Sequence, residues 1–189
     1  MTGTLHAAAE KLGGLLRERN ETVSVAESVT SGHIQAAIGR VSGASDYFLG
    51  GITAYALDAK VRLLGVDLEH ARSSKCVSPQ IAFEMAAGIA QRFGSHWSVS
   101  TTGYAELSPA DQVDQPSAFV SVWHAPRPYI ATADEGIVMT QGSEVAKQHL
   151  FVDVGSTASR IENQQSFAWT ALELLISAIV GARYGPLEQ

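Results

Sequence analysis

The sequence has little that could cross-link it or hold a metal ion. A single cysteine, Cys76, occurs among its 189 residues, which excludes a disulfide within the chain. No His, Cys and carboxylate residues gather at the spacing of a metal site. Cys76 also lacks a nearby His or Asn that would make it a nucleophile. We therefore predict no metal and no cofactor, and a small packed residue at Cys76.

Charge and long apolar runs are scarce as well. Charged residues make up 17% of the chain, and 13 basic against 19 acidic residues give a formal charge of −6. This balance argues against nucleic-acid binding, which depends on Lys and Arg neutralising phosphates. The most apolar segment, 168–180, is interrupted by Glu173 and is shorter than the roughly 18 residues of a membrane span. The first residues lack the order of a signal peptide. We expect a cytoplasmic protein without membrane contact.

Hydrophobic residues, by contrast, reach 46% of the chain, enough for the core of one domain over residues 1–189. Helical and strand periodicities alternate along most of the sequence. This order predicts an α/β protein, a three-layer α/β/α sandwich with a mixed sheet. The expected helices cover 4–19, 30–41, 58–64, a segment beginning at Pro79, and 159–180. The expected strands cover 22–26, 51–55, 98–101, 118–123, 136–140 and 150–154, with a loop at 103–116.

The first strand runs into a helix through Glu27, Ser28 and Val29, with Thr30 as the expected N-cap. Ser28 would then lie at the carboxyl end of a strand, where open α/β sheets bind ligands. A serine becomes a nucleophile when a neighbouring base takes its proton, and a buried lysine can be that base. Tyr55 and Lys60 flank a later strand-to-helix turn, so all three side chains would meet if their strands are neighbours. Spacing alone leaves this open.

Several short motifs follow one another along the chain in a recognisable order. They read Ala-Glu-Ser-Val-Thr-Ser-Gly at 26–32, Val-Ser-Gly-Ala-Ser-Asp-Tyr-Phe at 41–48, Thr-Ala-Tyr at 53–55, Ala-Lys at 59–60, Leu-Gly-Val at 64–66, Glu-Met-Ala-Ala-Gly at 84–88 and Thr-Gly at 102–103. Together they resemble the C-terminal domain of the CinA family, whose pattern is close to A-E-S-C-T-G-G, P-G-S-S-x-x-F and V-T-Y-S-N-x-A-K. The resemblance covers most of the chain.

Stand-alone members of that family deamidate nicotinamide mononucleotide to nicotinic acid mononucleotide and ammonia. The resemblance therefore implies a small-molecule nucleotide substrate and a nucleophilic Ser28, with Lys60 and Tyr55 moving its proton. It implies substrate contacts at Thr102, which would support the oxyanion or the substrate amide. The remaining expected substrate-binding residues are Thr30, Gly32, Gly103 and Arg160. Backbone N–H groups at the start of the helix after Ser28 are the expected oxyanion donors.

The sequence departs from the family around the expected phosphate site. Family members carry G-I-A-G-P and further glycines where this chain has Gly103-Tyr-Ala-Glu-Leu-Ser-Pro109. Glycines let backbone N–H groups approach a phosphate, and Glu106 adds a negative charge. Ser31 replaces the first glycine of the family's G-G, and Gln164 stands where a second arginine is expected after Arg160. Two alternatives follow: a relative that binds a nucleotide-like ligand or protein without catalysis, or an amidase for a phosphate-free amide.

Three other expectations concern neighbouring residues. His33 follows Ser28 by about one turn, and we interpret it as a packing or surface residue rather than a base. Glu27 should point away from Ser28 on an extended chain and support neighbouring backbone groups. The final helix is more apolar than a surface helix needs, which favours a homo-oligomer, a dimer or higher.

Overall fold

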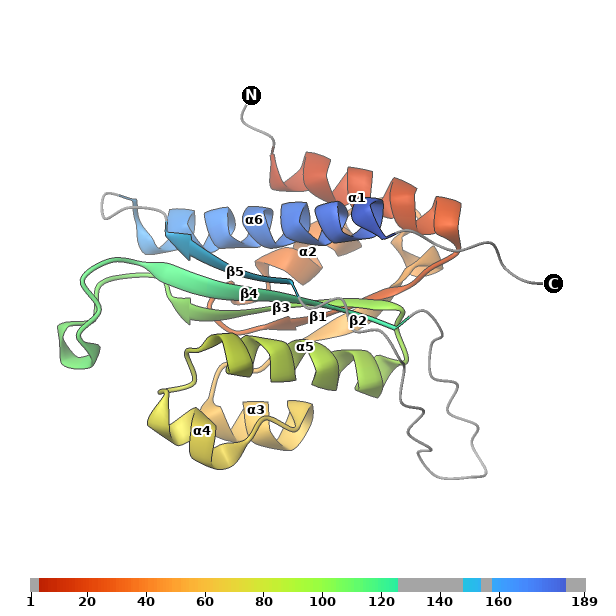
Figure 1. Cartoon of the computed structure of the whole chain (residues 1–189). Coiled ribbons are helices and arrows are strands. Elements are labelled where there is room, and N and C mark those ends of the chain that lie inside the picture. Colours follow the sequence, from red (N-terminus) through yellow and green to blue (C-terminus); the bar gives the residue numbers. More distant parts are fainter. Residues whose placement is uncertain (1–3, 126–147, 154–157, 183–189) are drawn as a thin grey trace, which may run out of the picture.

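A mixed sheet of five strands lies between two layers of helices in the computed structural model of the protein (Figure 1). The structure describes residues 4–125, 148–153 and 158–182. The strands are ordered β2-β1-β3-β4-β5. Strand β1 (Val23–Glu27) pairs in parallel with β2 (Phe48–Thr53) and β3 (Trp97–Tyr104), while β4 (Ser117–His124) and β5 (Gln148–Asp153) add antiparallel to β3. The predicted α/β/α sandwich with a mixed sheet is confirmed.

The helices divide between the two faces of the sheet (Figure 1). One face is covered by α1 (Leu5–Arg19), α2 (His33–Gly39) and α6 (Arg160–Gly181). The other is covered by α3 (Leu57–Leu64), α4 (Leu68–Ser73) and α5 (Pro79–Phe93). Consequently, α2 connects β1 to β2 across one face, and α3, α4 and α5 connect β2 to β3 across the other.

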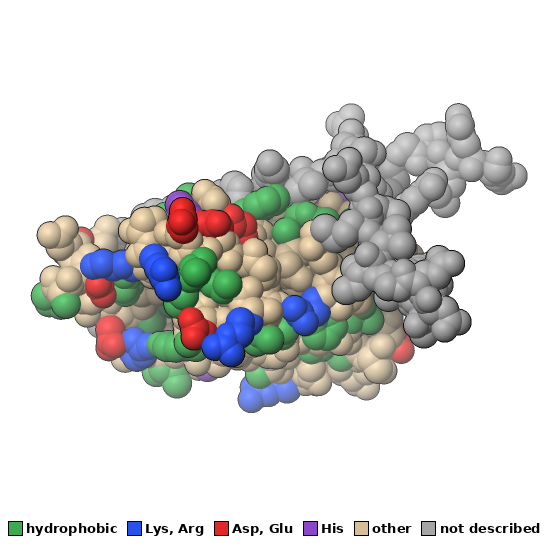
Figure 2. Space-filling model, turned by 90° about the horizontal axis from the view of Figure 1, so that it is seen from below, with side chains coloured by type: hydrophobic (Ala, Val, Ile, Leu, Met, Phe, Trp, Pro, Cys, Tyr) green, Lys and Arg blue, Asp and Glu red, His purple; other side chains and the backbone are tan. Residues whose placement is uncertain are grey.

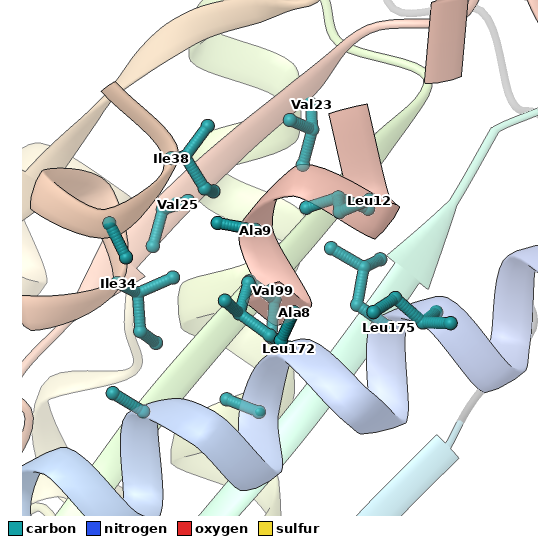
Figure 3. Close-up of a cluster of buried hydrophobic side chains, with 14 of the residues drawn as sticks. Ala8, Ala9, Leu12, Val23, Val25, Ile34, Ile38, Val99, Leu172 and Leu175 are labelled. Carbon is teal, nitrogen blue, oxygen red and sulfur yellow. The ribbon is translucent and has the colours of Figure 1, made fainter. Parts of the chain in front are cut away.

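The larger core lies between the sheet and the first of these helix layers (Figure 3). Leu12 of α1, Ile34 and Ile38 of α2, and Leu172 of α6 are fully buried there against Val25 of β1. Each such side chain contributes about 1.5–3 kcal/mol by leaving water. This burial positions α2 and α6, the two helices whose first turns border the end of β1 and the loop after β3.

The predicted helix ends at residues 19 and 64 and the predicted helix start at Pro79 are confirmed. Asn20 ends α1 and Gly65 ends α3, both in the left-handed conformation, with φ of 53° and 69°. Ser78 caps α5, whose first residue is Pro79. In contrast, Thr30 as the cap of α2 is wrong, because the helix begins at His33 and its N-cap is Gly32.

Other boundaries also differ from those expected. The strand predicted at 51–55 is β2 at 48–53, so Tyr55 lies beyond its end. Strand β3 continues through residue 104, which takes the start of the predicted 103–116 loop into the sheet. Helix α4 was not predicted, since its six residues are too few to show a period. The strand predicted at 136–140 lies outside the described residues.

The apolar residues of α6 pack within the chain. Nine of its residues are buried, among them Phe167, Leu172, Leu175 and Ile179. Most of the apolar side chains of α6 thus pack within the chain, while Ile161 and Val180 are exposed, and the homo-oligomer stays a prediction. On the opposite side of the molecule, basic and acidic side chains lie interspersed over the α3, α4 and α5 face (Figure 2). None of the described helices has the length and apolarity to cross a membrane.

Gly88 of α5 is required by the packing of α5 on α3. A β-carbon at Gly88 would overlap the backbone carbonyl of Leu64, whereas one at Gly14 of α1 would meet no heavy atom within 4 Å. We expect Gly88→Ala to lower the free energy of unfolding by about 1–3 kcal/mol, because backbone would have to move. The matched control Gly14→Ala should raise it by about 0.5–1 kcal/mol through helix propensity. Urea denaturation measures both, and equal stability of the two variants would contradict the packing argument.

Candidate active site

Ser28 follows the last residue of β1, the middle of the three parallel strands. Its N–H donates to Thr101 O of β3 at 3.0 Å, and the N–H of Ala54 donates to Glu27 O at 2.8 Å. Both neighbouring strands therefore hold this end of β1. Because the connections from β1 and β2 run over opposite faces, Ser28 lies at a topological switch point, where open α/β sheets bind their ligands.

The carboxylate of Glu27 shapes the turn that follows Ser28. Glu27 is fully buried, and its two oxygens accept from the N–H groups of Gly32 at 2.9 Å, Ile34 at 3.1 Å and Gln35 at 2.9 Å. It therefore satisfies the free donors at the start of α2. The expectation that Glu27 supports neighbouring backbone is confirmed. The expectation that these helix N–H groups serve an oxyanion is wrong for these three residues.

Lys60 of α3 reaches Ser28 from the opposite face of the sheet. Lys60 Nζ lies 2.9 Å from Ser28 Oγ, 2.9 Å from Ala54 O and 2.8 Å from Tyr55 O. The residue is only 2% exposed, and no carboxylate forms a salt bridge with it among the described residues. Burial lowers the pKa of Lys60, while Cys76 raises it to a smaller extent.

These three contacts suit a neutral amine that acts as a base. An uncharged lysine amine has two N–H donors and one lone pair in a tetrahedral arrangement. As an ammonium, Lys60 donates to Ser28 Oγ and to the carbonyls of Ala54 and Tyr55; as an amine it donates to the two carbonyls and its lone pair faces Ser28 Oγ. In this state Ser28 donates its hydroxyl hydrogen to Lys60, as a nucleophile activated by a base requires. The expected pairing of Ser28 with Lys60 is present in the structure.

The phenol of Tyr55 has a different partner from the one expected. Its side chain is 56% exposed, and its hydroxyl accepts from Arg160 Nη2 at 2.7 Å. No hydrogen bond among the described residues joins this hydroxyl to Ser28 or Lys60. Arg160 Nη1 in turn donates to Glu106 Oε1 at 2.5 Å. Tyr55 thus contacts Lys60 through its backbone carbonyl and Arg160 through its side chain.

A cavity of about 380 Å³ opens beside these groups. Ser28, Tyr55 and Lys60 line it, as do three of the expected substrate-binding residues, Thr102, Gly103 and Arg160. Thr102 donates its hydroxyl hydrogen to Cys76 O at 2.6 Å, which leaves its oxygen lone pairs available. A β-carbon at Gly103 would overlap Ser117 O of β4, so strand packing alone requires this glycine.

The other two expected substrate-binding residues lie elsewhere. Thr30 and Gly32 are not among the residues that line the cavity. The hydroxyl of Thr30 hydrogen-bonds with that of Thr101 at 2.7 Å, and Gly32 occupies the N-cap of α2 with a φ of 98°. Ser31 before it is also left-handed, with a φ of 52°. A sharp turn of this kind explains why the family pattern has two glycines here, because glycine adopts positive φ without strain.

Two backbone N–H groups next to Ser28 have no acceptor among the described residues, and that of Val29 is the one at the cavity. Among the hydrogen bonds of the described residues, none uses the N–H of Val29 or of Thr30. Val29 lines the cavity. The N–H that follows a nucleophilic serine is well placed to stabilise the oxygen of a tetrahedral intermediate.

Several contacts of the site have no signature in the sequence. The acceptors from Ala54, Tyr55 and Cys76 are backbone carbonyls, which every residue carries. His33 lines a separate hollow between α1, α2 and α6, so its exclusion as the base agrees with its position. Within the described ranges no group of three or more His, Cys, Asp or Glu residues is arranged to hold a metal ion.

Comparisons with known proteins identify relatives over most of the chain. A family model described as CinA C-terminal domain matches residues 5–179. A CinA-like protein from Salinibacter ruber is 36% identical over 86% of this chain and 34% of its own length. Another from Picosynechococcus sp. is 42% identical over 63% of this chain and 28% of its own length. The chain thus spans about a third or less of these curated relatives.

Solved structures agree on the fold. The competence/damage inducible protein CihA from Agrobacterium tumefaciens superposes with a TM-score of 0.74 at 25% identity, covering 94% of this chain and 96% of its own. The competence damage-inducible protein A from Klebsiella pneumoniae has a TM-score of 0.78 at 18% identity, covering 96% and 100%. At 18% identity the second likeness concerns the fold alone.

The pairing of Ser28 with a buried lysine predicts a pH-dependent nucleophile. We expect the rate at which a sulfonyl fluoride labels Ser28 to rise with pH as Lys60 loses its proton. The midpoint should lie below 10.5, the ordinary lysine value, because burial lowers the pKa of Lys60. Lys60→Met should slow labelling at pH 8 by about 100-fold or more. Intact-mass spectrometry measures the rate, with Ser28→Ala as the blank. Unchanged labelling of Lys60→Met would exclude Lys60 as the base.

Proposed function

The chain belongs to the CinA C-terminal domain family, and we propose that it is an amidohydrolase that cleaves a linear carboxamide with Ser28 as nucleophile and Lys60 as base. The observation that carries the proposal is the 2.9 Å contact between Lys60 Nζ and Ser28 Oγ inside a cavity. Nicotinamide mononucleotide, the substrate that the family resemblance implies, is the first candidate.

The first half of the proposed reaction forms an ester on Ser28. Ser28 Oγ attacks the carboxamide carbon as its proton passes to Lys60 Nζ. The N–H of Val29, which lines the cavity, stabilises the resulting oxyanion. When the C–N bond breaks, Lys60 returns the proton to the nitrogen, which leaves as ammonia. Thr102 lines the cavity, and in the proposed reaction its hydroxyl oxygen accepts a hydrogen bond from a carboxamide N–H group.

The second half consumes one water molecule. Water attacks the ester carbonyl while Lys60 takes a proton from it, and the same donor stabilises the second oxyanion. The bond to Ser28 then breaks, Lys60 returns the proton to Ser28 Oγ, and the product is released as a carboxylic acid that loses its remaining proton to solvent. Neither half needs a cofactor or a metal, and one lysine serves both, since its neutral form is restored after each step.

Ammonia release tests the proposal directly. We expect the wild-type protein to release ammonia and nicotinic acid mononucleotide, or the matching acid of a related pyridine carboxamide. Ser28→Ala and Lys60→Met should each lower kcat by about 1,000-fold or more, since the nucleophile and its base act as a unit. Exposed residues outside the cavity provide matched controls, Ser45→Ala and Lys11→Met, which should keep wild-type rates.

A protein that binds such a ligand without cleaving it is the alternative, favoured by the presence of Glu106 in the cavity lining. No ammonia from any tested carboxamide at high protein concentration, with ligand binding retained, would support that alternative. Equal residual rates in wild type and Ser28→Ala would also overturn the proposed mechanism.

Tyr55→Phe separates the two contributions of Tyr55. Its backbone carbonyl holds Lys60 and is unaffected by the change, while its phenol contacts Arg160. We therefore expect kcat to fall by less than about tenfold, well under the effect of removing a general acid or base. Steady-state ammonia release measures the effect. A loss of about 100-fold or more would assign the phenol to proton transfer, as the family resemblance implies.

A further inference from the structure

The loop after β3 places a carboxylate against two of the three basic side chains that line the cavity. The charged residues that line the cavity are Lys60, Lys75, Glu106 and Arg160. Arg160 Nη1 pairs with Glu106 Oε1 at 2.5 Å, and Lys75 Nζ pairs with Asp111 Oδ1 at 2.7 Å. Both carboxylates come from the segment 105–116. Lys60 contacts Ser28 Oγ and the carbonyls of Ala54 and Tyr55 and has no carboxylate partner among the described residues.

The backbone next to Glu106 is held in place by a contact with α6. The carbonyl of Ala105 accepts from Asn163 Nδ2 at 2.9 Å. Asn163 is a buried residue of α6, and it lies one turn after Arg160 on the same helix. One helix therefore fixes the backbone beside Glu106 and also supplies its partner, so the ion pair is part of the loop's docking on α6.

Asp111 is likewise held by the loop itself. The backbone N–H of Ser108 donates to Val113 O at 3.0 Å, and that of Val113 donates to Ser108 O at 3.0 Å. Ser108 Oγ donates to Asp111 Oδ2 at 2.8 Å. The second carboxylate is thus oriented toward Lys75 by a closed turn.

We propose that Glu106 determines the charge selectivity of this site, so that the cavity takes carboxamides without a phosphate group in preference to phosphorylated ones. The inference rests on the proposed amidohydrolase function and names its substrate class. A phosphate in the cavity would have to displace Glu106 from Arg160 or lie beside its carboxylate, and both cost binding energy. A neutral or cationic carboxamide, such as nicotinamide or its riboside, avoids that cost.

The expected selectivity is modest. The side chains of Arg160 and Glu106 are 43% and 61% exposed, and solvent weakens exposed ion pairs. A pair of this kind is worth up to about 1 kcal/mol, which corresponds to roughly fivefold in an equilibrium constant. Removing the Glu106 charge also removes its repulsion of a phosphate, so about three- to tenfold is the effect to look for.

Binding to Ser28→Ala provides the first arm of the test, because it does not depend on turnover. Nicotinamide riboside and nicotinamide mononucleotide are titrated into Ser28→Ala by calorimetry. We expect the riboside to bind more tightly. In Ser28→Ala/Glu106→Gln the affinity for the mononucleotide should rise about three- to tenfold relative to the riboside. Glu18→Gln, an exposed change on α1 outside the cavity, is the matched control and should leave the ratio unchanged.

A third variant tests whether the effect passes through Arg160. In Ser28→Ala/Glu106→Gln/Arg160→Met the gain for the mononucleotide should be smaller than in Ser28→Ala/Glu106→Gln, since no freed guanidinium remains and only the lost repulsion contributes. Thermal unfolding confirms that each variant is folded before it is titrated. Tighter binding of the mononucleotide than of the riboside, or a ratio that Glu106→Gln leaves unchanged, would overturn the inference.

Turnover provides the second arm and separates this inference from the proposed function. In an otherwise wild-type chain, Glu106→Gln should raise kcat/KM for the mononucleotide relative to the riboside by the same factor. Hydrolysis with no change in that ratio would contradict the selectivity inference but not the proposed amidohydrolase function. Absence of hydrolysis, with the binding ratio shifted as expected, would contradict the proposed amidohydrolase function but not the charge selectivity of the cavity.

Discussion

The burial of Lys60 without a counterion is the constraint on which the rest of the site depends. A charged ammonium is costly in such surroundings, so burial favours the amine, whose two N–H groups still need acceptors. The carbonyls of Ala54 and Tyr55 supply them. Residues 54 and 55 can do so because β2 ends at Thr53, which frees their carbonyls from pairing with a neighbouring strand. The end of β2 at Thr53 therefore provides the two backbone acceptors that Lys60 needs in its buried position.

Because side chains alternate along β1, the adjacent residues Glu27 and Ser28 have different roles on opposite faces of the sheet. Successive side chains of a strand point to opposite faces, so Glu27 faces α2 while Ser28 faces α3. The Glu27 carboxylate takes up the first N–H groups of α2, which removes them from any role toward a ligand. The N–H of Val29, before the helix begins, is the donor at the cavity that stays free for an oxyanion at Ser28. The capping that fixes the turn thus also fixes which donors the site can use.

The sequence predicts the parts of this site that local patterns encode. Periodicity and caps place α1, α5 and α6 and the end of α3, and a strand followed by a helix places Ser28 at a sheet edge. The pairing of Ser28 with Lys60 came from the family resemblance, because spacing alone left it open. Contacts such as Arg160 with Tyr55, 105 residues apart, or Asn163 with Ala105, depend on how α6 docks. No local pattern records that docking, nor which backbone carbonyls turn toward a lysine.

The two ion pairs of the loop also affect the pKa of Lys60. An unpaired carboxylate near Lys60 would favour its ammonium form and raise its pKa, which would weaken it as an acceptor of the Ser28 proton. With Glu106 paired to Arg160 and Asp111 paired to Lys75, neither carboxylate acts on Lys60 as an isolated charge. A phosphate dianion inside the same cavity would bring back such a charge. The two ion pairs that would oppose a phosphate therefore also prevent two carboxylates from acting as isolated charges that would raise the pKa of Lys60.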